Sequence, residues 1–257
     1  MMEAAAGLLG LAGPALWLAG AVFLRVGAMM ALLPAFGEQS VPVRVRLALA
    51  LAFTAIVAPA VAPLMPREPP GWQGAPLWLL TETVSGLALG LALRLFVVAL
   101  QTAGAIAAHA TSLSQLLGPA ALEPLPAMGQ LMVVGGLALA ALAGLHVKLV
   151  ELMVLSYRIL PPGGVPPPGD IAEWGVAQVA RAFALAFSLA APFVVASFLY
   201  NLALGAINRA MPQLMVAFVG APVITAGGLV LLALALPALL GVWLTAFDDF
   251  LAAPMAP

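Results

Sequence analysis

Two charged residues, Glu82 and Arg94, lie inside one long apolar stretch of the sequence. A charge within a bilayer costs about 2.5–3.5 kcal/mol even on the lenient insertion scale, so such residues pair, line a polar path or lie at an interface. Their separation corresponds to about 18 Å along a helix axis, which is too far for the two to pair with each other. Each therefore needs a partner elsewhere. A proton-coupled carrier could use Glu82, and an assembly protein could equally bury it against a neighbouring subunit.

The other chemistry-bearing residues form no catalytic or metal-binding pattern. The two histidines, His109 and His146, are far apart and belong to no HExxH motif, and the chain has no cysteine. The aspartates, Asp170, Asp248 and Asp249, fall in a proline-rich connection and near the C-terminus, where water would solvate them. The sequence also lacks a glycine-rich phosphate loop. We therefore predict a protein that is not an enzyme and that uses no metal or cofactor.

The composition decides which elements must hold these residues. Of the 257 residues, 64% are hydrophobic and only 7% are charged, and the net charge is −1. An ordinary soluble domain has roughly 25% charged residues, so this chain cannot cover a globular surface in water. It also lacks the basic excess of a nucleic-acid binder. The apolar runs are long and do not alternate, which favours helices over a transmembrane barrel and predicts an all-α, polytopic helical membrane protein.

Charges, prolines and glycines separate about six apolar segments. They span approximately residues 4–33, 47–65, 76–108, 128–160, 171–204 and 214–247. The first lacks the positive n-region of a cleaved signal peptide, so we expect it to be a retained span. Five prolines and three glycines within Pro161–Asp170 predict an extended linker after the fourth segment. Pro222 and Pro237 are expected to kink or break the sixth segment.

Small residues recur at four-residue spacing in three of the segments. The series are Gly86 and Gly90; Gly136, Ala140 and Gly144; and Ala182, Ala186 and Ala190. This spacing lets helix backbones approach closely, which is a main source of helix association in lipid. We expect most of these positions to serve helix packing, and none of them specifies a function.

Two short motifs carry more specific information. One is a loop of the pattern SVP-x-R-x-[RK], formed by Ser40, Val41, Pro42, Arg44 and Arg46. The other is an NR-x-x-PQ turn between two apolar segments, formed by Asn208, Arg209, Pro212 and Gln213. With Glu82, Gly86 and Gly90 in the third segment, the chain from about residue 15 to residue 245 resembles the flagellar biosynthetic protein FliR family, whose injectisome relatives share the pattern.

The resemblance implies a subunit of the type III protein export gate in the bacterial inner membrane, at the flagellar basal body. In that family the first four segments are similar to FliP and the last two to FliQ. This implies a FliP-like part (1–160), the linker (161–170) and a FliQ-like helical hairpin (171–257). The implied partners are FliP-like and FliQ-like chains, a FlhB-like gate protein and unfolded export substrates. Two alternatives stay open: the equivalent subunit of a virulence injectisome and, from another class, a secondary membrane transporter.

The resemblance also implies roles for particular residues. A plug in the closed pore is expected from Thr111, Ser112, Leu113, Ser114, Gln115, Leu116 and Leu117. Its leucines could form a dry seal, while its polar side chains offer replaceable hydrogen bonds that ease opening. Assembly or structural roles are expected for Pro42, Arg44, Arg46, Glu82, Arg94, Asn208, Arg209, Pro212 and Gln213. Pro212 should bend the hairpin turn, and Arg209 should meet an acidic or carbonyl-lined site.

Overall fold

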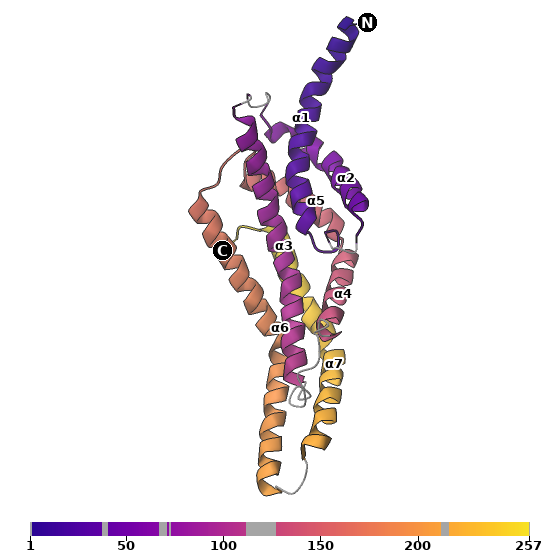
Figure 1. The fold of residues 1–257 in the computed structure, drawn as a ribbon, viewed down its shortest axis with the longest axis vertical. Helices are drawn as coiled ribbons and strands as arrows, with labels where there is room; N and C mark the ends of the chain where they lie inside the picture. The colour runs from indigo at the N-terminus through magenta and orange to yellow at the C-terminus, as the bar shows by residue number, and fades with distance from the viewer. Residues whose placement is uncertain are drawn as a thin grey trace. The chain divides into compact units, whose positions relative to one another are not determined.

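The computed structural model of the chain describes residues 2–37, 41–66, 71, 73–111, 127–211 and 216–256. All regular structure within these residues is helical (Figure 1), which confirms the all-α prediction. The elements are α1 (Met2–Leu32), α2 (Val43–Val61), the short 3-10 helix η1 (Ala62–Leu64), α3 (Ala75–Thr111), α4 (Ala127–Leu142), α5 (Leu145–Ile159), α6 (Pro168–Ala210) and α7 (Val216–Ala252).

Most of these helices are suited to a bilayer. By length and composition, five helices of the described chain could cross a membrane, namely α1, α2, α3, α6 and α7. A sixth crossing is possible if α4 and α5, which are bent by 78° at their break, count as one span. The prediction of a polytopic membrane protein with about six apolar segments is therefore confirmed.

The fourth predicted segment is two helices rather than one. Between α4 and α5 lies Gly144, whose φ of +83° is in the left-handed region that only glycine adopts without strain. A Cβ added to Gly144 would meet nothing within 4 Å. Gly144 is therefore not among the small residues that serve close packing, and its role is to let the backbone turn between the two helices.

The connection before α6 is shorter than the predicted linker. Pro168, Gly169 and Asp170 form the first turn of α6 instead of extended chain. Proline suits the first helical position because its φ is preset and its missing N–H is not needed there. Asp170 lies in the first turn, where the helix dipole favours a negative charge.

The prolines of the last segment do not interrupt it. We expected Pro222 and Pro237 to kink or break this segment. The described backbone is helical from Val216 to Ala252, so neither proline breaks it. In membrane helices, neighbouring side chains and small backbone adjustments satisfy the carbonyl that a proline leaves free. Other prolines also lie inside helices, at Pro14 in α1, Pro59 in α2 and Pro192 in α6.

The chain forms two compact units. The first comprises residues 1–95, 143–178 and 248–257, and in it α2 packs against α1 and α5. The second comprises residues 96–142 and 179–247. Several helices contribute to both, because the divisions at 95/96, 178/179 and 247/248 fall inside α3, α6 and α7.

Glycines and aromatic rings hold the second unit together. A Cβ on Gly104 of α3 would lie 2.2 Å from the Cα of Gly129 in α4, so the two backbones touch directly. A Cβ on Gly136 would lie 2.7 Å from a methyl group of Leu100, in line with the packing role expected of that glycine. The buried Trp243 of α7 donates its ring N–H to the carbonyl of Phe96 at 2.9 Å.

Candidate functional site

Glu82 is completely buried on α3, and its partner is Arg25 of α1. The two side chains are 0% and 2% exposed. Arg25 Nε donates to Glu82 Oε2 at 2.8 Å and Nη2 donates to Oε1 at 3.1 Å. This bidentate geometry is the strongest form of a carboxylate–guanidinium contact. The partner that the sequence left open is thus in the same chain, not in a neighbouring subunit.

Arg25 also binds the C-terminal end of α5. Its Nη1 donates to the carbonyl oxygens of Ser156 at 3.1 Å and Leu160 at 2.9 Å. Carbonyls at the C-terminal end of a helix carry the negative end of the helix dipole, which favours a cation there. The guanidinium carbon lies 3.9 Å from the centre of the Tyr157 ring, so the cation is held by a π-face as well.

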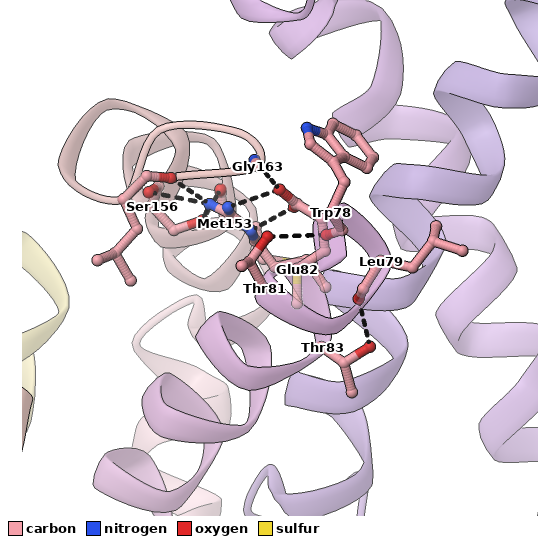
Figure 2. A network of polar contacts seen from close by, with 10 residues as sticks. Trp78, Leu79, Thr81, Glu82, Thr83, Met153, Ser156 and Gly163 are labelled. Carbon is pink, nitrogen blue, oxygen red and sulfur yellow. Dashed lines mark hydrogen bonds and ion pairs between the residues drawn. The ribbon is translucent and has the colours of Figure 1, made fainter. Parts of the chain in front are cut away.

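The turn that follows α5 is attached to the same carboxylate. Figure 2 shows Gly163 next to Glu82 and Trp78, and the Gly163 N–H donates to Glu82 Oε1 at 2.9 Å. Gly163 has a φ of +68°, and a Cβ there would lie 1.8 Å from Cδ1 of Trp78. Trp78 in turn packs on Trp17 of α1, with ring centres 5.2 Å apart. Only glycine fits this position, for reasons of both conformation and space.

Two glycines allow α1 to come close enough for the ion pair. A Cβ on Gly86 would lie 2.2 Å from the carbonyl oxygen of Arg25, and a Cβ on Gly90 would lie 2.8 Å from that of Met29. Because Glu82, Gly86 and Gly90 follow one another at four-residue spacing, they lie on one face of α3. The packing role predicted for these two glycines is confirmed.

We name the set Arg25, Glu82, Ser156, Tyr157, Leu160 and Gly163 the buried charge network. Both carboxylate oxygens of Glu82 already accept hydrogen bonds, and the side chain has no exposed surface. A proton carrier needs a carboxylate that exchanges with water or substrate. The described residues also contain no cluster of three or more histidines, cysteines or acidic residues that could hold a metal. The arrangement is suited to fixing helices, not to moving protons.

The other predicted site residues of the first unit lie outside this network. Pro42 directly precedes α2 and is exposed, as is Arg44 in the first turn. Arg46 is half-buried, and its Nε donates to the carbonyl of Val41 at 3.2 Å. Arg94 is half-buried on α3 and takes part in an interaction of its own.

The remaining predicted site residues belong to the hairpin turn and the plug. Asn208 and Arg209 are exposed in the last turn of α6. Thr111 is the buried last residue of α3. Pro212 and Gln213 of the turn and residues 112–117 of the plug lie outside the described residues.

Sequence reasoning missed Arg25 as a site residue. One signal was present: Arg25 is the sole charge in the first apolar segment, and its sign is opposite to that of Glu82. Pairing charges between different segments could have joined them. Leu160 and Gly163 take part through backbone groups, which leave no signature in a single sequence.

The sequence that builds this network matches a known family. Residues 16–250 match the family described as bacterial export proteins, family 1. The chain belongs to the FliR family of bacterial export proteins. The resemblance drawn from the two motifs is therefore confirmed.

Three relatives show how far the similarity extends. The flagellar biosynthetic protein FliR of Caulobacter vibrioides is 36% identical over 237 residues, which cover 91% of this chain and 94% of the relative. FliR of Escherichia coli is 31% identical over 83% of this chain and 82% of the relative. FliR of Bacillus subtilis is 28% identical, with 78% and 79% covered. The chain is thus a membrane protein of the FliR family, an export component of the flagellar type III export apparatus.

Proposed function

We propose that the chain is a subunit of the flagellar type III export gate, in the bacterial inner membrane at the basal body. It forms a helical pore with FliP-like and FliQ-like chains and a contact with a FlhB-like protein, and unfolded flagellar proteins pass through this pore. Family membership over residues 16–250 supports the proposal. The named relatives are flagellar proteins, which favours the flagellum over an injectisome.

The length of the apolar helices carries the proposal beyond family membership. α7 has 37 residues and no charge before Asp248. Its uncharged part is about 48 Å long, whereas the hydrocarbon core of a bilayer is about 30 Å thick. Even a tilt of about 40°, the upper end of the usual range, would accommodate only about 39 Å. Lipid alone therefore cannot cover this helix, which supports a place for it among other protein helices.

α6 offers a surface for such neighbours. It has 43 residues, and Phe183, Phe187 and Phe198 are each more than half exposed within this chain. Large apolar surfaces of this kind mark protein or membrane contacts. Together with the length of α7, they support a hairpin that packs among other helices of an assembly.

The proposed division into a FliP-like part (1–160) and a FliQ-like hairpin (171–257) needs an attachment between the two parts. The first compact unit contains one. Lys148 of α5 pairs with Asp248 of α7 at 2.7 Å, and the ring N–H of Trp174 in α6 donates to the carbonyl of Pro254 at 2.9 Å. The first contact supports an attachment of the hairpin to the preceding part of the chain, and the second joins the two ends of the hairpin to each other.

We also propose that residues 111–117 act as the plug of the closed pore. Thr111, the one residue of this segment that the structure describes, is buried on α3. The leucines of the segment can exclude water, and its serines and glutamine can exchange hydrogen bonds during opening.

Co-purification tests the proposed assembly. The tagged full-length chain is expressed with the FliP-like and FliQ-like chains of the same bacterium and extracted in mild detergent. A defined complex of all three is expected, while the chain expressed alone should aggregate because its long apolar surfaces lack neighbours. An unrelated tagged polytopic protein serves as the control. A monodisperse, thermally stable monomer that captures neither partner would refute the proposal.

A further inference from the structure

The connection between α5 and α6, residues 160–167, has little means of holding itself in place. It reads Leu-Pro-Pro-Gly-Gly-Val-Pro-Pro, so half of its residues are prolines. A proline has no N–H and cannot donate to a helix or a strand. One backbone hydrogen bond lies within the connection, from the Gly164 N–H to the carbonyl of Pro161 at 3.0 Å. Val165 is 60% exposed. Contacts from other parts of the chain must therefore fix its path.

The buried charge network supplies such contacts to two backbone groups of the connection. Arg25 Nη1 donates to the carbonyl of Leu160 at 2.9 Å, where the connection begins. The Gly163 N–H donates to Glu82 Oε1 at 2.9 Å, near its middle. Both bonds join a backbone group to an ionised side chain, and such bonds are stronger than those between neutral groups. α1 and α3 thus hold the connection at two points.

The ring of Trp78 limits the same turn. A Cβ on Gly163 would lie 1.8 Å from Cδ1 of Trp78, so the turn lies directly against this ring. Trp78 is only 7% exposed and packs on Trp17 of α1. In Figure 2 the Gly163 N–H is directed at the Glu82 carboxylate, close to this ring. The turn therefore has a hydrogen bond that directs it and a buried side chain that limits its movement.

The start of α6 follows directly from the end of the connection. The N–H of Ile171 donates to the carbonyl of Pro167 at 3.2 Å, so the first helical hydrogen bond of α6 reaches back into the connection. A helix is stiffer than irregular chain. The position of the connection therefore decides where the first turn of α6 lies.

An ion pair provides something here that apolar residues would not. A buried pair adds little net stability over apolar side chains of similar volume. Leucine or methionine, however, could bind neither the Leu160 carbonyl nor the Gly163 N–H, because their side chains lack strong donors and acceptors. One guanidinium, with five donors, reaches the Glu82 carboxylate and the Leu160 carbonyl together. The advantage of the pair is thus a fixed position for the connection.

We propose that Arg25 and Glu82 are positioning residues that hold the α5–α6 connection in one place and thereby fix where α6 starts. The inference rests on the proposed function, in which this connection joins the FliP-like part to the FliQ-like hairpin. A hairpin that starts at a fixed place enters the gate in one orientation, whereas a free proline-rich connection would let it pivot. Export through the gate then depends on the two charges.

Hydrogen exchange of the full-length chain, in its complex with the FliP-like and FliQ-like chains, tests this directly. The connection has only four amides, those of Leu160, Gly163, Gly164 and Val165. Mass spectrometry with fragmentation of the peptide that covers them assigns the exchange to single residues. In the unaltered chain, Gly163 should exchange about tenfold or more slowly than in a free peptide of the same sequence, as expected for a hydrogen bond to a charged group. Equal rates in the chain and in the peptide would overturn the proposal.

The variant Arg25→Met/Glu82→Leu should accelerate exchange of the Gly163 amide by about tenfold or more. Lys148→Met/Asp248→Leu is the matched control, because it removes the other ion pair of the same unit, which does not contact the connection. Its Gly163 amide should exchange as in the unaltered chain. Equal Gly163 rates in the two double variants would overturn the proposal. If the first variant does not fold, the comparison of the unaltered chain with the free peptide still decides.

Swimming in soft agar tests the consequence. Cells with Arg25→Met/Glu82→Leu should contain a normal amount of the complex and swim several-fold more slowly than cells with the unaltered chain. Normal swimming despite fast Gly163 exchange would overturn the positioning role. Failure of the proposed function has a different signature: the unaltered chain would capture neither FliP-like nor FliQ-like chains, while its own Gly163 amide stayed protected.

Discussion

Arg25 and Glu82 are 57 positions apart in the sequence and form a buried, two-pronged ion pair, with Nε–Oε2 and Nη2–Oε1 distances of 2.8 and 3.1 Å. The same guanidinium binds the end of α5, and the same carboxylate binds the turn at Gly163. One pair of side chains therefore joins α1, α3, α5 and the connection to α6. A buried pair adds little net stability over apolar residues, but the loss of one partner leaves the other charge unmatched.

Removing one charge should therefore be worse than removing both. Glu82→Leu is expected to destabilise the chain by about 3–5 kcal/mol, because Arg25 then stays buried without a counter-ion. The double variant Arg25→Met/Glu82→Leu should recover most of that loss, since no unpaired charge remains. Unfolding of the detergent-solubilised complex, followed by circular dichroism, measures both.

A second ion pair provides the control for this prediction. Lys148 and Asp248 are 30% and 36% exposed, so Asp248→Asn should change stability by at most about 1 kcal/mol. If Glu82→Leu were no more damaging than Asp248→Asn, or if the double variant were the worst of the three, the account of the buried charge network would be wrong.

The contact between α1 and α3 should be sensitive to a single methyl group. Gly86→Ala places a Cβ on the backbone carbonyl of Arg25, which cannot move aside as a flexible side chain could. We expect a loss of about 1–3 kcal/mol from overpacking. Gly20→Ala in α1 meets nothing within 4 Å and should be neutral or stabilising by up to about 1 kcal/mol. The melting temperatures of the two variants measure this difference. Similar values for both would contradict the close approach of α1 and α3.

Several features were predictable from the sequence because they depend on local pattern. Long uncharged runs predict long helices, and the four-residue spacing of Gly86 and Gly90 predicted their packing role. The cost of a charge in an apolar segment predicted that Glu82 needs a partner. These arguments use the residue and its near neighbours alone.

The features that were missed depend on contacts between distant segments or on backbone geometry. The choice of Arg25 as the partner of Glu82 requires knowing which faces of α1 and α3 meet. The sequence could not show that Gly144 breaks the helix. A glycine at four-residue spacing looks the same whether it allows close helix packing or a turn of the backbone. The Gly163 N–H that binds Glu82 is a backbone group, which every residue except proline has.

The hairpin turn should depend on Arg209, which is exposed in the last turn of α6. If it meets an acidic or carbonyl-lined site on a partner chain, Arg209→Ala should reduce swimming motility and the yield of complex. Arg209→Lys should restore these only in part, because the fork of five donors is lost. Arg158→Ala is the control: it is exposed in the last turn of α5, and its loss removes only a dipole interaction of about 0.3–1 kcal/mol. Full motility of Arg209→Ala would mean that Arg209 is a solvated loop residue.

Gly144 should be required for its backbone conformation and not for its size. Its φ is +83° and an added Cβ has free space around it, so Gly144→Ala introduces backbone strain without a collision. A left-handed conformation is about 1–2 kcal/mol less favourable for an ordinary L-residue, and we expect a loss of stability of that size. Gly144→Asn should lose less, because asparagine adopts this conformation more readily than other side chains. Gly205→Ala in α6, also with free space but without a positive φ, should show no loss. Thermal unfolding of the three variants in the same detergent gives the order of their stabilities. If Gly144→Ala were as stable as Gly205→Ala, the break between α4 and α5 would not depend on glycine.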